Sequence, residues 1–117
     1  MKKYFFITGI AIVTIIFSNC NSAKKTAATP VVKSTYTNDI TTVIMNNCVP
    51  CHIPAKGGFK KAYDNYENVK TDIDEIVRRI ELQPNEKGFM PFKKTVPLPD
   101  STISKFKKWR DDGLLEK

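Results

Sequence analysis

The sequence predicts an all-α fold with long loops. Apolar residues recur at intervals of three and four positions in separate stretches, which is the spacing of helices that bury one face. Proline and glycine crowd the segment from 83 to 99, where they prevent regular secondary structure. No stretch alternates apolar and polar residues as a half-buried strand does. These observations predict three to four short helices joined by long connections.

The first residues are typical of an exported protein. Lys2 and Lys3 precede an apolar run from Tyr4 to Phe17, and this run is shorter than the ~20 residues that a helix needs to cross a bilayer. A basic start followed by a short apolar stretch is typical of a secretory signal peptide. We therefore expect residues 1–19 to be a signal peptide, with an uncleaved apolar anchor as the alternative.

The next segment predicts lipidation. Residues 17–20, which read Phe-Ser-Asn-Cys, resemble the lipobox of bacterial lipoproteins, in which the cysteine is acylated and becomes the mature N-terminus. Phe17 and Asn19 differ from the commonest lipobox, which has leucine and then glycine or alanine there. The resemblance implies an acylated Cys20 that anchors the protein to a bacterial membrane, facing the periplasm. The alternative is an ordinary signal peptide that leaves Cys20 free, although a free thiol is a liability in an oxidising compartment.

Residues 20–35 are expected to combine the lipidated cysteine with a flexible tether. They are rich in alanine, threonine, lysine and serine, and they lack an amphipathic period. The remaining residues, 36–117, have the length of one domain, so a large two-domain enzyme or a polytopic membrane protein is excluded. The net charge of +7 raises nucleic acid as a partner. Export and the absence of a basic helix with base-reading residues argue against nucleic acid.

Apolar residues recur at helical spacing between residues 36 and 48, and we expect a first helix there with Thr37 or Asn38 as its N-cap. One face of this helix is apolar and carries Tyr36, Ile40, Val43, Ile44 and Cys48. After His52, proline and glycine mark a loop. Residues 64–69 are expected to form one short helical turn.

A second amphipathic helix is expected over residues 72–82, and a last helix is expected from Asp100 or Ser101 to Gly113. The buried face of the helix over 72–82 is expected to carry Ile73, Ile76, Val77 and Ile80. The buried face of the last helix is expected to carry Ile103, Phe106 and Trp109. A domain of about 80 residues with helices this short rarely builds a sufficient core unaided. A large apolar cofactor would complete that core and would also hold the long loop from 83 to 99.

Cys48, Cys51 and His52 supply a motif for such a cofactor. Their C-x-x-C-H spacing is typical of covalent haem c attachment. Two thiols three positions apart reach the two vinyl groups on one porphyrin edge, and the adjacent imidazole binds the iron. A structural zinc site would need four nitrogen or sulfur ligands, and only three remain once Cys20 is lipidated. A thioredoxin-like dithiol would need a βαβ context, and a plain disulfide would leave the small core unexplained.

With this motif in place, residues 36–117 resemble a small single-haem cytochrome c domain of the class I type, in the form found as a bacterial lipoprotein. The resemblance rests on the C-x-x-C-H motif, on a Gly-Phe-Met-Pro segment at 88–91, and on a closing helix in which Trp109 precedes Gly113. It implies a cytochrome c-like fold wrapped around one covalently bound haem c, and a single-electron carrier rather than an enzyme. It also implies that the first and last helices pack together. The residues that would meet there are Ile40, Ile44, Phe106 and Trp109.

The sixth iron ligand is expected to be Met90. His52 is the only histidine of the chain, and a thioether is the usual partner of histidine in electron-transfer haems. Met1 leaves with the signal peptide, and Met45 is expected to pack as core. Met90 lies in the proline-rich loop, where the cytochrome family carries its axial methionine. The alternatives are a haem-based ligand-binding or sensing module with an open or displaceable sixth site, and a haem-free thiol-disulfide protein.

Lysines gather in the segments that the resemblance would place around the haem edge. They are Lys56, Lys60 and Lys61 after the histidine, and Lys93 and Lys94 after the methionine. Charge complementarity raises the rate of encounter more than the affinity. We therefore expect redox partner proteins with an acidic docking patch, and the alternative is a solvated basic face that keeps the protein soluble.

Overall fold

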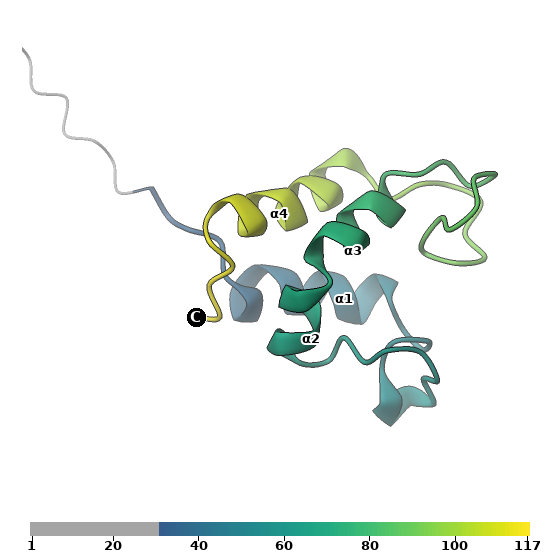
Figure 1. Cartoon of the computed structure of the whole chain (residues 1–117), viewed down its shortest axis with the longest axis horizontal. Helices are drawn as coiled ribbons and strands as arrows, with labels where there is room; N and C mark the ends of the chain where they lie inside the picture. The colour runs from purple at the N-terminus through teal and green to yellow at the C-terminus, as the bar shows by residue number, and fades with distance from the viewer. Residues whose placement is uncertain (1–30) are drawn as a thin grey trace, which may run out of the picture.

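Four α-helices and irregular connections make up the part of the chain that the computed structural model describes, residues 31–117 (Figure 1). Within this range no strand forms, and the only extended pairing is an isolated bridge between Thr35 and Leu115. The predicted all-α class with long loops is confirmed. The expected signal peptide, Cys20 and residues 21–30 of the expected tether lie outside the described residues. None of the described helices is long and apolar enough to span a membrane.

The first helix begins as a π-helical turn, η1 (Tyr36–Ile40), and continues as α1 (Thr41–Asn47). Its N-cap is Thr35, whose hydroxyl oxygen accepts a hydrogen bond from the backbone N–H of Asn38 at 3.3 Å. The expectation that Thr37 or Asn38 caps this helix is therefore wrong. Thr35 has the extended backbone of an N-cap residue, whereas the other two already lie inside the helical turn.

Met45 lies on the exposed side of α1, and the expectation that it packs as core is wrong. Its exposed fraction is 41%, whereas the neighbouring Ile44 is buried. Ile40, Val43 and Ile44 define the buried face of this helix, and at about 100° per residue Met45 points away from that face. Met45 is therefore not held in place by the core.

Two helices follow the loop after α1, which itself contains a short 3₁₀ turn, η2 (Pro54–Lys56). The first, α2 (Tyr66–Thr71), is capped by Asn65, whose side-chain oxygen accepts from the backbone N–H of Asn68 at 3.0 Å. The second, α3 (Ile73–Ile80), buries the apolar face that the sequence predicts. Both helices begin one or two residues later than expected.

The last helix, α4 (Asp100–Asp111), buries Ile103, Phe106 and Trp109, as expected. It stops before Gly113, whose φ of +99° favours glycine. The helix packs against η1 and against α3. The expected packing of the first and last helices is confirmed. The residues predicted to meet there, Ile40, Ile44, Phe106 and Trp109, belong to one buried cluster.

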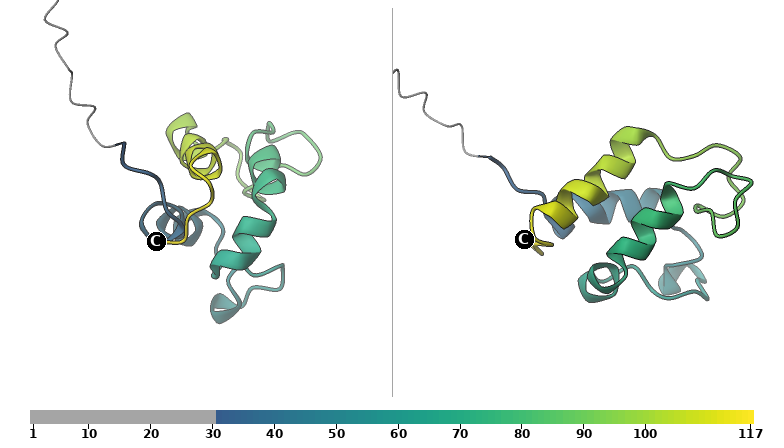
Figure 2. Two further views of the ribbon diagram at one scale, coloured as in Figure 1. Left: turned by 60° about the vertical axis from the view of Figure 1, so that its left-hand side comes forward. Right: turned by 45° about the horizontal axis from the view of Figure 1, so that its top comes forward.

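The two ends of the domain are tied together at one end of the molecule. The backbone N–H of Tyr36 and the indole N–H of Trp109 both donate to the carbonyl of Leu115, at 2.8 Å and 2.7 Å. The hydroxyl of Tyr66 donates to the neighbouring carbonyl of Leu114 at 2.8 Å. The loop after α1 and the loop between α3 and α4 both reach toward the opposite end (Figures 1 and 2).

Candidate functional site

A cavity of about 1110 Å³ lies between the loop after α1 and the loop between α3 and α4. Its volume exceeds the ~300–1,000 Å³ of most small-molecule sites. The residues that sequence analysis selected for one cofactor all line this cavity: Cys48, Cys51, His52 and Met90. The structure thus brings the C-x-x-C-H motif and the distant methionine to one place.

Cys48 and Cys51 are both free thiols. Cys48 directly follows α1, where its backbone N–H donates to the carbonyl of Ile44 at 2.8 Å, and its side chain packs against the buried cluster. Burial raises the pKa of the Cys48 thiol to about 11, so this thiol is protonated near neutral pH. The end of α1 therefore fixes one cysteine, and the second follows it in the next turn.

One ring nitrogen of His52, Nδ1, is hydrogen-bonded to the protein backbone. Its Nδ1 lies 2.8 Å from the backbone carbonyl oxygen of Lys61. Because a carbonyl can only accept, Nδ1 carries the proton, and in the neutral imidazole the lone pair is then on Nε2. This is the arrangement in which a histidine binds a metal through Nε2 while a backbone carbonyl holds the other nitrogen.

In the turn that carries Cys51 and His52, the backbone of Gly58 lies close to the backbone of Pro50 and Ile53. A Cβ atom at Gly58 would lie 2.5 Å from the carbonyl oxygen of Pro50 and 2.7 Å from the backbone nitrogen and oxygen of Ile53. Ile53 is buried, and its carbonyl accepts the N–H of Gly58 at 3.0 Å. No side chain fits at residue 58 unless the turn opens.

Met90 is placed by the attachment of its loop to α3. Its backbone N–H donates to the carbonyl of Arg79 at 3.1 Å, and the preceding Phe89 is buried. The Met90 side chain packs against the buried cluster and lines the cavity. Met45, the other methionine in the described range, does not line the cavity. The geometry therefore favours Met90 over Met45 as a ligand.

The walls of the cavity are largely apolar. Buried side chains form its inner wall, namely Val43, Ile76, Ile80, Leu98 and Phe106. Phe59 and Phe92 also line it, yet they are 76% and 67% exposed. Exposed aromatic rings beside an apolar cavity indicate a surface that binds an apolar ligand.

Basic side chains outnumber acidic ones around the cavity. The basic ones are Lys60, Lys61, Arg79, Lys87, Lys93 and Lys94, and the acidic ones are Asp72, Glu75 and Glu86. Lys56, the remaining lysine of the expected cluster, is exposed but does not line the cavity. Glu75 accepts hydrogen bonds from Arg78 and Arg79, which lower its pKa to about 2. The excess of positive charge favours a ligand that carries negative groups.

Tyr63 lies flat against His52, a contact that no sequence pattern indicates. The two rings are parallel within 2°, and their centroids are 4.4 Å apart. The hydroxyl of Tyr63 donates to Asp72 at 3.0 Å, and burial, the largest cause, raises the pKa of this hydroxyl. The only sequence signal for this contact is that both rings belong to the loop after α1.

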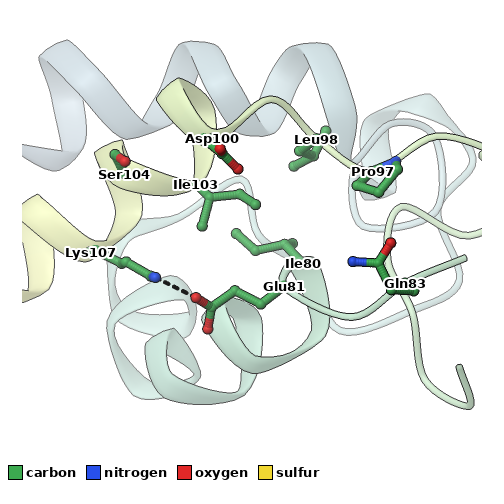
Figure 3. A pocket seen from close by; sticks show the side chains of 9 residues that line it. All are labelled: Ile80, Glu81, Gln83, Pro97, Leu98, Asp100, Ile103, Ser104 and Lys107. Atoms are coloured by element: carbon green, nitrogen blue, oxygen red, sulfur yellow. Dashed lines mark ion pairs between the residues drawn. The ribbon is translucent and has the colours of Figure 1, made fainter.

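A second, smaller cavity of about 320 Å³ lies between α3 and α4 (Figure 3). Its lining includes Ile80, Leu98 and Ile103, and the ion pair between Lys107 and Glu81 crosses it. No residue that sequence analysis selected for chemistry lies there. This hollow is part of the contact between the two helices.

Comparison with known proteins adds no assignment, because no family model, curated protein or solved structure matches this chain. Among residues 31–117, no three His, Cys, Asp or Glu side chains are grouped so that they could hold a metal ion. The larger cavity must therefore be interpreted from its own residues.

Proposed function

We propose that the larger cavity holds one covalently attached haem c and that the protein is a membrane-tethered single-electron carrier, a small class I cytochrome c. One observation carries the proposal: the C-x-x-C-H motif and Met90, which are far apart in the sequence, line the same large cavity. Neither a disulfide nor a zinc site accounts for the methionine, for the apolar walls or for the volume. A covalent haem accounts for all three.

The residues of the cavity have separate tasks in this proposal. Cys48 and Cys51 would hold the porphyrin through thioether bonds, and Nε2 of His52 would bind the iron, while its Nδ1–H donates to the backbone carbonyl of Lys61. Met90 would supply the second protein ligand of the iron, a soft thioether that favours the ferrous state. When bound, the haem supplies one-electron chemistry by changing between the ferric and ferrous states.

The remaining lining suits the other parts of a haem. The apolar inner wall and the exposed rings of Phe59 and Phe92 match the faces of the macrocycle. The excess of lysine and arginine around the cavity matches its two propionates. The same lysines form the surface on which a redox partner with an acidic patch docks.

The tether completes the proposal. Acylation of Cys20 after removal of residues 1–19 anchors the domain to a membrane of the bacterial cell envelope. The described chain enters the domain at Thr35, which bridges to Leu115 near the C-terminus, away from both cavity loops (Figure 1). An anchor attached there leaves the cavity free to meet partners.

Loss of both cysteines tests the attachment. The full chain is expressed in a host that matures c-type cytochromes, together with the double variant Cys48→Ala/Cys51→Ala. We expect wild-type protein to retain haem through denaturing electrophoresis and acid-acetone extraction, because thioether bonds survive both. The double variant loses the haem and folds poorly, because the core loses its centre.

Reduced and oxidised absorption spectra of the same samples separate the alternatives. A haem that binds carbon monoxide at once in the wild-type protein would favour ligand binding or sensing, with an open sixth site. A native wild-type domain without haem, in which Cys48 and Cys51 form a disulfide, would contradict the proposal.

A further inference from the structure

The ring of His52 is held by a closed set of contacts within one loop. Lys61 accepts from Nδ1 through its backbone carbonyl at 2.8 Å. Tyr63 stacks on the ring at a centroid distance of 4.4 Å, and its backbone N–H donates to the carbonyl of His52 at 2.8 Å. One partner therefore sets the tautomer and the other sets the plane of the ring.

Both partners are bonded to a single carboxylate. The ammonium group of Lys61 lies 2.6 Å from Oδ1 of Asp72, and the hydroxyl of Tyr63 donates to Oδ2 at 3.0 Å. Each oxygen of Asp72 thus holds one of the two residues that touch His52. The backbone of Tyr63 has a further attachment, because its carbonyl accepts the hydroxyl of Tyr36 at 3.3 Å.

Asp72 is unusual for the place it occupies. It is the N-cap of α3, where an aspartate commonly accepts a hydrogen bond from the first turn of its own helix. Its side chain makes no such bond. Its backbone is nevertheless fixed, because its N–H donates to Asn68 at 3.2 Å and its carbonyl accepts from Ile76 at 2.8 Å. The side chain of Asp72 is thus bonded to the loop after α1, through Lys61 and Tyr63, and does not cap its own helix.

We propose that Asp72 is a positioning residue for His52: through Lys61 and Tyr63 it fixes the ring plane and the tautomer that leave Nε2 free to bind a metal. The carboxylate is hydrogen-bonded to Lys61 and Tyr63 and not to His52, and it acts by joining the loop to α3. Outer partners of this kind commonly change metal affinity or activity by ~10–100-fold when they are removed. The proposal rests on the proposed function only in taking Nε2 as the metal-binding nitrogen.

The single histidine makes the test direct. The full chain is labelled with ¹⁵N-histidine, so that every imidazole signal belongs to His52. We measure the ¹⁵N shifts, which report the tautomer, and the solvent exchange of the Nδ1 proton, which reports opening of the loop. Diamagnetic ferrous protein is used where haem is attached, and the same label serves for haem-free protein. Haem attachment is scored separately by denaturing electrophoresis, so failure of the proposed function and failure of this proposal are distinguishable.

Asp72→Ala is compared with Asp74→Ala. Asp74 is two residues further along α3, its side chain is 84% exposed, and it does not line the cavity. We expect Asp72→Ala to accelerate exchange of the Nδ1 proton by at least about tenfold, which corresponds to one lost hydrogen bond to a charged group. Asp74→Ala should leave both the shifts and the exchange rate unchanged.

Tyr63→Phe keeps the test decisive if Asp72→Ala does not fold. It retains the stacked ring and removes only the hydrogen bond to Asp72, so exchange should accelerate in the same direction by a smaller factor. Asp72→Asn, which retains one acceptor oxygen, should restore part of the protection. Wild-type shifts and exchange rates in both Asp72→Ala and Tyr63→Phe would overturn the proposal.

Discussion

The two ring nitrogens of His52 differ in their hydrogen bonding, and this difference determines which of them can bind a metal. Nδ1 donates to a backbone carbonyl, whereas Nε2 retains its lone pair. The C-x-x-C-H motif could be recognised because its members are adjacent in the sequence, and the choice of Met90 followed from elimination and resemblance. The contacts of His52 with Lys61 and Tyr63 could not be predicted, because they depend on how an irregular loop closes.

Met90→Ala tests the sixth ligand. We expect the oxidised variant to lose the weak far-red band of a methionine sulfur on ferric haem. Its potential should fall, because a soft thioether stabilises the ferrous state, and carbon monoxide or cyanide should bind readily. Absorption spectra and a redox titration measure these effects.

Met45→Ala is the matched control, because this methionine is exposed and lies outside the cavity. Its spectrum and potential should equal those of the wild type. If Met90→Ala also behaves as wild type, the sixth ligand is another group and the sensing alternative gains support.

The helices illustrate which elements a sequence can predict. In α3 and α4 the buried residues follow the helical period closely, and both helices form where the pattern places them. The N-cap of the first helix was predicted wrongly, because Thr35, Thr37 and Asn38 are all residue types that can cap a helix and only the backbone shows that Thr35 does so. The loops have no periodic pattern of apolar residues, so the cavity that they enclose could not be predicted from the sequence.

Gly58→Ala tests the turn that presents Cys51 and His52. The added methyl would lie 2.5 Å from the carbonyl oxygen of Pro50, so the turn must open. We expect incomplete haem attachment and a clear loss of thermal stability. Haem content per chain and the thermal unfolding midpoint measure the two effects.

Gly57→Ala is the control for this prediction. Gly57 has a φ of +81°, but a Cβ atom there meets nothing within 4 Å. The variant should show only the ~1 kcal/mol of backbone strain that a left-handed residue costs, with complete haem attachment. Equal behaviour of the two variants would show that close packing at Gly58 is not needed for the turn.

At the scale of the whole molecule, the larger cavity lies away from the place where the start and the C-terminus of the domain meet. Tyr36 and Thr37 are hydrogen-bonded to Leu115 and Glu116 at one end, and the two loops that line the larger cavity reach toward the other (Figure 2). In the proposed function, a tether attached at the first end would leave the second end free for docking. The small helical core, which the sequence suggested would need a cofactor, is open to a large apolar cavity on this side.

Lys93→Glu/Lys94→Glu tests docking at the cavity. Both lysines line it, so reversing their charge should slow electron transfer with an acidic partner without moving the potential much. Transfer by wild-type protein should also slow as salt rises, because the Debye length is only ~8 Å at physiological ionic strength. Stopped-flow rates at several salt concentrations measure both effects.

The control Lys33→Glu/Lys105→Glu changes the net charge equally, but both positions are exposed and lie outside the cavity lining. It should slow transfer far less. If the two double variants have equal rates at every salt concentration, the lysines at the cavity form only a solvated face.

The most direct test of the central claim is the intact mass of the denatured chain after expression in a host that matures c-type cytochromes. A covalently attached haem adds the mass of one haem to the polypeptide, and denaturation does not remove it. We predict this added mass for the wild-type chain and its absence when Cys48 and Cys51 are both replaced. A natively folded wild-type chain with the bare polypeptide mass, or with that mass less the two hydrogens of a Cys48–Cys51 disulfide, would contradict the account.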